Sequence, residues 1–224
     1  MNFTEKYLSE TKNIAEIIDS NVIEKIADSI VELRNNGGRL FWVGSGGGAG
    51  HSSHAVCDFR KISNIECYTP TDNVSELTAR VNDDGWDTSY SNWLKVSKFS
   101  SKDALFVLSV GGGNKEKEVS VNLVNCIELA REKGSKIFGI VGRDGGFTKE
   151  SSDLVVVVPT IDESLVTPHT EGWQAVVWHL LVSHPKIAKN EMKWEKKFFF
   201  FQIMCAACWH SFWSLKFNVP NALR

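Results

Sequence analysis

The sequence predicts a doubly wound α/β domain built on a five-stranded parallel sheet. Four short apolar runs alternate with segments whose apolar residues recur every three or four positions; these runs lie within 39–44, 104–114, 135–142 and 153–159. A weaker run, IECYT at 65–69, supplies the fifth strand. Continuous apolar strands joined by helices are typical of a parallel sheet with both faces covered.

The N-terminal part of the chain is predicted to be helical. Its apolar residues follow a helical spacing of three and four; they are Ile14, Ile17, Ile18, Val22, Ile26, Ile30 and Leu33. The stretch Asp19-Ser20-Asn21 divides the segment into two helices, and the glycines of NNGG at 35–38 end the second one. We assign residues 1–36 to N-terminal helices of the same domain, and residues 37–197 to the sheet and its covering helices.

Composition excludes several classes of function. Of the 224 residues, 42% are hydrophobic and 23% are charged, and the net charge of −2 provides no basic field for nucleic acid. The first residues, MNFTEKYLSETKN, lack the basic-then-apolar pattern of an export signal. Five cysteines, an odd number, are typical of reduced thiols in such a chain. We therefore expect a cytoplasmic protein that binds neither nucleic acid nor membrane.

Glycine clusters follow two of the predicted strands, at the sheet edge where ligands of such folds bind. GSGGGAG at 44–50 is not a dinucleotide fingerprint, because no acidic residue closes a second strand about twenty positions later. It is not a P-loop either, since no Lys-Ser/Thr pair follows. We therefore expect no nucleotide cofactor.

SVGGGNK at 109–115 repeats the glycine cluster, with Ser109 and Asn114 as side-chain donors and Asn114 as a helix N-cap. Glycines let backbone N–H groups approach an anion closely. Two such loops therefore predict a phosphate-bearing ligand. The alternative is that the glycines only form tight turns.

Two histidines and two carboxylates are predicted to share helix faces. His54 and Asp58 are four residues apart after the first loop, and Glu171 and His179 are eight apart in TPHTEGWQAVVWH at 167–179. Such a set suits Zn²⁺ or another divalent metal, and the same groups suit acid–base catalysis without metal. The alternatives are that His179 is a hydrogen-bonded core residue and that His54 and Asp58 form a surface pair.

Several motifs together resemble a known family. In chain order they are GSGGG with His54, VNDDG at 81–85, LSVGGGN at 108–114, AREKGSKIFGIVGRDGG at 130–146 and TPHTEGWQAVVWH. The ordered set is similar to the sugar isomerase (SIS) domain, and within it to the phosphoheptose isomerases. The resemblance implies a flavodoxin-like five-stranded sheet and a homotetramer with active sites between subunits. It also implies bound zinc and conversion of sedoheptulose 7-phosphate to D-glycero-D-manno-heptose 7-phosphate, for surface polysaccharide such as lipopolysaccharide or capsule.

The resemblance assigns site residues by position. The metal ligands it implies are His54, Asp58, Glu171 and His179. The substrate-binding positions it implies are Ser45, Gly46, Gly47, His54, Asp58, Asn82, Asp83, Ser109, Val110, Gly111, Asn114 and Glu171. The chain departs from the family pattern in its serine-poor phosphate loop, in Asp58 where the family has glutamate, and in Glu171 where it has glutamine. The extra charge of Glu171 favours a divalent metal and disfavours a nearby phosphate.

These assignments predict a phosphosugar aldose–ketose isomerase. Asp58 and His179 are the expected catalytic acid–base pair, and Zn²⁺ or another divalent metal is the expected cofactor. Two alternatives stay open. One is a phosphosugar-binding or partner-binding module without catalysis, which the missing serines favour; the other is an isomerase of a different phosphosugar.

The stretch 198–224, FFFFQIMCAACWHSFWSLKFNVPNALR, differs from the rest of the chain. It has no acidic residue and no clean helical period. One interpretation is a hydrophobic tail that packs between subunits. The other, which we favour, is out-of-frame translation, because the run KKFFFF implies consecutive A and T tracts and the resemblance ends there.

Overall fold

The computed structural model describes residues 1–191, so the tail at 198–224 and the predicted domain end at 197 lie outside the described residues. The N-terminal segment forms two helices, α1 (Phe3–Ile17) and α2 (Ser20–Asn35), as predicted. The break between them is fixed by Asp19, whose Oδ1 accepts hydrogen bonds from the N–H groups of Asn21 and Val22 at 2.9 and 3.3 Å.

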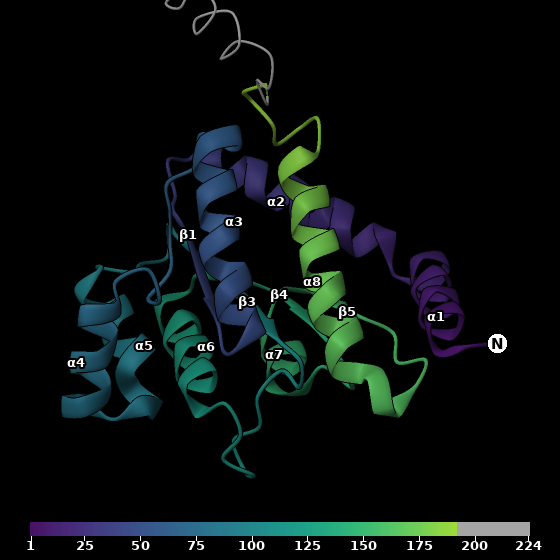
Figure 1. The fold of residues 1–224 in the computed structure, drawn as a ribbon. Coiled ribbons are helices and arrows are strands. Elements are labelled where there is room, and N and C mark those ends of the chain that lie inside the picture. The colour runs from purple at the N-terminus through teal and green to yellow at the C-terminus, as the bar shows by residue number, and fades with distance from the viewer. Residues whose placement is uncertain (192–224) are drawn as a thin grey trace, which may run out of the picture. The chain divides into compact units, whose positions relative to one another are not determined.

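Strands and helices then alternate along the chain. The elements are β1 (Leu40–Gly44), α3 (Gly47–Ser63), β2 (Cys67–Tyr68), α4 (Val74–Asp84), α5 (Trp86–Val96), β3 (Ala104–Ser109), α6 (Val121–Lys133), β4 (Lys136–Val141), α7 (Gly146–Ser151), β5 (Leu154–Val157), the 3₁₀ turn η1 (Glu163–Leu165) and α8 (Val166–Ser183) (Figure 1). The strands are all parallel in the order β2-β1-β3-β4-β5. This order confirms the predicted doubly wound, flavodoxin-like class.

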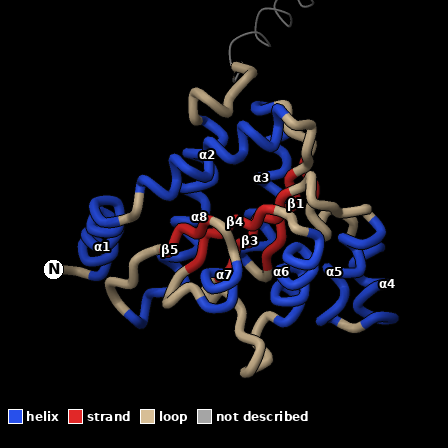
Figure 2. Tube along the Cα trace, turned by 180° about the vertical axis from the view of Figure 1, so that it is seen from behind, coloured by secondary structure: helices blue, strands red, loops and turns tan. Residues whose placement is uncertain are grey.

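Neighbouring positions in the central strands pack on opposite faces of the sheet. Leu40 and Trp42 belong to a core shared with α2, α3 and α8, whereas Phe41 and Val43 belong to a core shared with α5 and α6. All four side chains are fully buried. The strands thus lie between two helical layers (Figure 2), which is why each run is apolar throughout.

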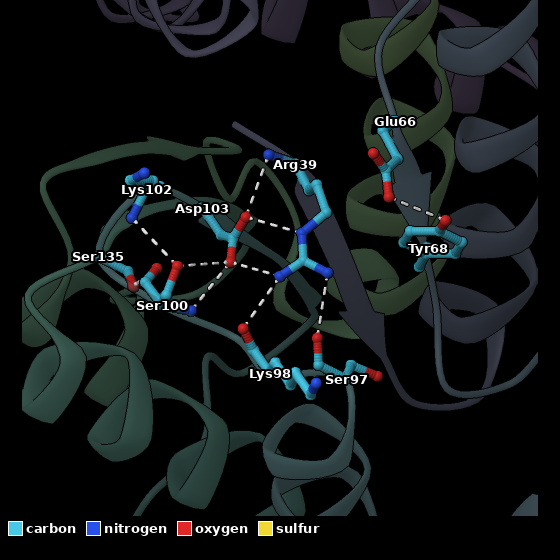
Figure 3. A network of polar contacts seen from close by, with 9 residues as sticks. All are labelled: Arg39, Glu66, Tyr68, Ser97, Lys98, Ser100, Lys102, Asp103 and Ser135. Atoms are coloured by element: carbon cyan, nitrogen blue, oxygen red, sulfur yellow. Dashed lines mark hydrogen bonds and ion pairs between the residues drawn. The ribbon is translucent and has the colours of Figure 1, made fainter. Parts of the chain in front are cut away.

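The N-terminal ends of β1 and β3 are joined by a partly buried ion pair, in which Asp103 is buried and Arg39 is half-buried (Figure 3). The Arg39 guanidinium donates to both Asp103 carboxylate oxygens, Nε to Oδ1 at 3.0 Å and Nη2 to Oδ2 at 2.9 Å. Burial raises the pKa of Asp103, but hydrogen bonds from Arg39 and from the Ser100 N–H outweigh it and leave that pKa lowered. This network fixes one end of the sheet and leaves the opposite edge for the ligand.

The carboxyl ends of β1 and β3 are the point where the strand order reverses. From β1 the chain turns to β2 on one side, and β3 lies on the other side of β1. A crevice forms at such a point because the two following loops run in opposite directions. The loops that start at Gly44 and Ser109 meet there, with Gly44 of β1 level with Leu108 of β3. None of the helices described for residues 1–191 is long and apolar enough to cross a membrane.

Candidate active site

The helices α3 and α8 lie side by side (Figure 1) and bring three of the four predicted ligands together. His54 Nε2 lies 3.7 Å from Asp58 Oδ2 on α3, and the ring of His179 on α8 lies 5.3 Å from that of His54, centroid to centroid. One donor atom from each of the three side chains lies within 4.8 Å of the others. Two imidazoles and a carboxylate at these separations form a compact nitrogen/oxygen donor set.

His179 is held in one tautomer by its own helix. Its Nδ1 lies 2.8 Å from the carbonyl oxygen of Ala175, which can only accept, so Nδ1 carries the proton and donates. The lone pair is then on Nε2, where it can bind a metal or take a proton. His179 is exposed and therefore is not the core histidine of the alternative interpretation.

Glu171 does not join the three-residue cluster. Its carboxylate lies against the first turn of α3, where a Cβ added to Gly47 would be only 2.6 Å from the carboxyl carbon. Eight residues along a helix correspond to about 12 Å of rise and about 80° of rotation, so Glu171 and His179 point in different directions.

His51 is a functional candidate that the sequence interpretation missed. Burial lowers its pKa, and the carboxylate and backbone carbonyl of Glu171 partly oppose this, while His54 and His179 lower it further. The ring is therefore close enough to Glu171, His54 and His179 to feel their charges. The signal was present in the sequence, because His51 precedes His54 by three residues and so shares its helix face.

A cleft of about 890 Å³ opens at the carboxyl ends of β1 and β3. Five predicted substrate-binding residues contribute to its lining: Ser45, Ser109, Val110, Gly111 and Asn114. Further lining residues were not predicted; they are Gly113, Lys117, Val119, Ser120, Arg143, Asp144, Thr160, Glu163 and Thr167. The cleft therefore offers hydroxyl groups and charged side chains as well as glycine backbone.

Glu171 lies between this cleft and the cluster. Along α8 it follows Thr167 of the cleft by one turn and precedes His179 by about two. Along the other wall, Ser45 of the cleft is followed by Gly47, against which the Glu171 carboxylate lies, and then by His54. The two helices thus arrange the cleft, the carboxylate and the cluster in one row.

The second glycine cluster, at 111–113, has a role in backbone packing as well as in lining the cleft. Gly112 has a φ of +72°, and a Cβ there would lie 1.9 Å from the carbonyl oxygen of Gly145. The loop before α7 and α7 itself are hydrogen-bonded to the same segment. The Gly142 N–H donates to the Val110 carbonyl and the Thr148 N–H to the Gly112 carbonyl, each at 2.9 Å. Gly111 and Gly113 both line the cleft, but only at Gly111 would an added Cβ make no close contact.

The prediction that Asn114 caps a helix is wrong. Its Oδ1 accepts a hydrogen bond from the Lys117 N–H at 2.7 Å, and its backbone pairs with Val119 in an antiparallel bridge. These contacts close a short hairpin at 114–119, so α6 starts only after Ser120. Ser120 has a φ of +53° and lines the cleft. It was not predicted as a site residue, because the hairpin that places it at the cleft was not predicted.

The turn after β1 is fixed from two sides. The Tyr90 hydroxyl donates to the Gly44 carbonyl at 3.1 Å, and Asn122 Nδ2 donates to Ser45 Oγ at 3.3 Å. Asn122 is fully buried, and its Oδ1 has no hydrogen-bond partner within residues 1–191. Gly46 follows with a φ of +58°, a conformation that favours glycine, and precedes α3.

Asn82 and Asp83 lie elsewhere on the described chain. They are exposed at the end of α4, where Asn82 Nδ2 donates to Asp83 Oδ1 at 2.7 Å. Neither residue lines the cleft. Their assignment to the sugar stays a prediction.

No family model matches the chain. The phosphoheptose isomerase of Aliarcobacter butzleri is 30% identical over 199 residues, which are 84% of this chain and 95% of the relative. The chain belongs to the phosphoheptose isomerase family. The resemblance inferred from the motifs is thereby confirmed, and the chain is an isomerase.

Two further comparisons agree with this family. The phosphoheptose isomerase of Chlorobaculum parvum is 31% identical over 183 residues, 79% of this chain and 83% of the relative. The solved structure of the phosphoheptose isomerase from Neisseria gonorrhoeae superimposes with a TM-score of 0.69 over 80% of this chain and 94% of that one, at 21% identity. The structural match establishes the shared fold.

Proposed function

We propose that this phosphoheptose isomerase converts sedoheptulose 7-phosphate to D-glycero-D-manno-heptose 7-phosphate, a step toward activated heptose for surface polysaccharide. The observation that carries the proposal is the row formed by the cleft, the Glu171 carboxylate and the cluster of His54, Asp58 and His179. A phosphosugar has the same order, with an anionic group at one end and a carbonyl at the other. The cleft receives the phosphate and so fixes the reacting carbons near the acid–base groups.

The reaction moves two protons. One passes from C1 to C2 of the sugar, and one from the C1 hydroxyl to the C2 oxygen, so a ketose becomes an aldose. We assign these transfers to Asp58 and His179, which lie in one donor cluster. His179 is suited to the role because its Nε2 lone pair faces away from the Nδ1 hydrogen bond to Ala175.

The residues present also fit a divalent metal. His54, Asp58 and His179 would hold it, since their donor atoms are mutually within 4.8 Å and the tautomer of His179 leaves Nε2 available. A bound Zn²⁺ or similar ion supplies polarisation of the sugar's carbonyl and hydroxyl oxygens. With a metal bound, Glu171 would be the carboxylate outside the donor set, and it would transfer the protons that Asp58 and His179 could not transfer while ligated.

We further propose a cytoplasmic homotetramer with active sites between subunits. Apolar side chains next to the site support an interface, because Val176 and Leu180, one turn apart on α8 and next to His179, are 47% and 43% exposed. The free thiols Cys57, Cys67 and Cys126 suit a reducing compartment. Light scattering on the purified protein tests the assembly, and a monomer would contradict it.

The activity is tested by incubating the protein with sedoheptulose 7-phosphate and following the aldose by NMR, with added Zn²⁺ or with a chelator. Turnover that is lost on chelation supports both the reaction and the metal. Turnover that is indifferent to the chelator keeps the isomerase and assigns the cluster to acid–base chemistry. Binding of the sugar without turnover would contradict the proposal and favour a phosphosugar-binding module.

A further inference from the structure

The phosphate loop has few side-chain donors. Within 109–114 only Ser109 and Asn114 have side-chain donors, and both side chains are neutral. The Ser109 Oγ also accepts the Gly112 N–H at 3.0 Å, and the Asn114 Oδ1 accepts the Lys117 N–H at 2.7 Å. A phosphate dianion is best held by charged donors, since their hydrogen bonds are about twice as strong as neutral ones. The cleft contains two cationic side chains, Lys117 on the hairpin and Arg143 after β4.

Arg143 is placed against the phosphate loop. Its Cδ lies 3.9 Å from the position of a Cβ added to Gly111, so the side chain runs beside the glycine that lines the cleft. The backbone on its N-terminal side is tied to the same loop by the hydrogen bond from Gly142 to Val110. The guanidinium is thus carried on a segment that is fixed relative to the loop.

Arg143 differs from the other arginines of residues 1–191 in having no internal partner. The others all donate hydrogen bonds within the protein; they are Arg34, Arg39, Arg60, Arg80 and Arg131. The adjacent carboxylate of Asp144 accepts instead from the Gly146 N–H at 3.1 Å. Within the described residues, the guanidinium therefore has its full set of donors available to a ligand.

The backbone of Arg143 is also in an uncommon conformation. Its φ is +53°, in the left-handed region that is unfavourable for a residue with a Cβ. The neighbouring positions 142, 145 and 146 are glycine, whereas position 143, which has this positive φ, is arginine. An arginine that is strained and makes no internal hydrogen bond points to a role in binding.

We propose that Arg143 binds the phosphate of the substrate as a bidentate donor, with Lys117 as a second cation on the hairpin side of the cleft. The inference rests on the proposed function, since it concerns the same cleft. Charge from these two side chains takes the place of the serine hydroxyls that the loop lacks. Arginine suits the task because its planar fork matches two phosphate oxygens at once.

The test compares Arg143→Gly with Arg143→Lys and with Arg131→Ala, a control on α6 outside the cleft. Calorimetry gives the Kd of inorganic phosphate and of sedoheptulose 7-phosphate, and the NMR assay gives the kinetics. We expect Arg143→Gly to weaken binding of both ligands about 10- to 100-fold, Arg143→Lys to recover part of the loss, and the control to bind like the wild type.

Stability provides a readout that a structural role would not produce. Glycine relieves the positive φ, so Arg143→Gly should melt about 2–4 °C higher while it binds phosphate less tightly. Unchanged Kd values for both ligands in Arg143→Gly would overturn the inference, and so would a wild type that binds neither ligand. A wild type that binds sedoheptulose 7-phosphate without isomerising it contradicts the proposed function alone, because the comparison of Kd values still tests Arg143.

Discussion

The contact between Gly47 and Glu171 leads to a prediction that separates stability from activity. In Gly47→Ala the new methyl group would lie 2.6–2.7 Å from the carboxyl atoms of Glu171, whereas ordinary contacts are 3.4–4 Å. The carboxylate must therefore move by about 1 Å. It can do so at little cost because it is the end of a flexible side chain.

The fold should tolerate the substitution. Gly47 is the first residue of α3 and does not have a positive φ, so alanine is compatible there and stabilises the helix by up to about 1 kcal/mol. Catalysis should not tolerate it, because a displacement of about 1 Å in a positioned group can reduce the rate about 100-fold. We expect kcat/KM for sedoheptulose 7-phosphate to fall by about that factor, with a melting temperature equal to or above that of the wild type.

Gly50→Ala is the matched control. Gly50 lies on the same helix, and a Cβ there meets nothing within 4 Å. This variant should keep the wild-type rate and show a similar gain in helix stability. If Gly47→Ala turned over like Gly50→Ala, the position of the Glu171 carboxylate would not matter for the reaction. A marked loss of stability in Gly47→Ala would show that the clash involves more than a side-chain end.

Three further predictions concern two side-chain pairs and the cluster. Asp103→Asn should lower the free energy of unfolding by about 2 kcal/mol in urea titrations at neutral pH. Because the pKa of Asp103 is lowered in the folded state, the free energy of unfolding of the wild type should fall as the pH drops below about 4. If Asp103→Asn lost as much stability as the wild type over this pH range, the prediction would be contradicted. Glu10→Ala removes the partner of buried His169, whose Nε2 lies 2.8 Å from Glu10 Oε2, and should lower the free energy of unfolding by about 3 kcal/mol. The exposed control Glu16→Ala should lower it by less than about 0.5 kcal/mol, and equal losses would refute the contrast. His179→Ala should lower kcat about 1,000-fold without changing the circular dichroism spectrum, and a near-normal rate would remove His179 from the mechanism.

The sheet could be predicted from the sequence because burial on both faces requires apolar runs without interruption. β2 was the weakest prediction for a physical reason. It is an edge strand of two residues, with Tyr68 38% exposed, so the pattern that identifies the central strands is absent. The break between α1 and α2 was predictable because Asp19 acts through local hydrogen bonds alone.

The site was only partly predictable, because helical spacing fixes faces but not distances. Spacing placed His54 and Asp58 together, since four residues return to nearly the same direction. It did not place Glu171 relative to His179, where an offset of about 80° accumulates over eight residues. Arg143 and Ser120 depend on how loops that are separate in sequence fold over one another, and no periodicity encodes that arrangement.

The hairpin at 114–119 has a consequence for how this isomerase can diverge. Thr167, Glu171 and His179 stand on one rigid helix, and removal of a single residue between them would turn the later side chains by about 100°. The hairpin is instead closed at its base by Asn114 and Val119, so its tip can change length while that bridge is kept. Mutations there reshape the cleft wall at Lys117 without altering the cluster of His54, Asp58 and His179. If the cleft binds phosphate as proposed, phosphate affinity and proton transfer are therefore separable, and the hairpin can change the former while the cluster that carries the latter stays as it is.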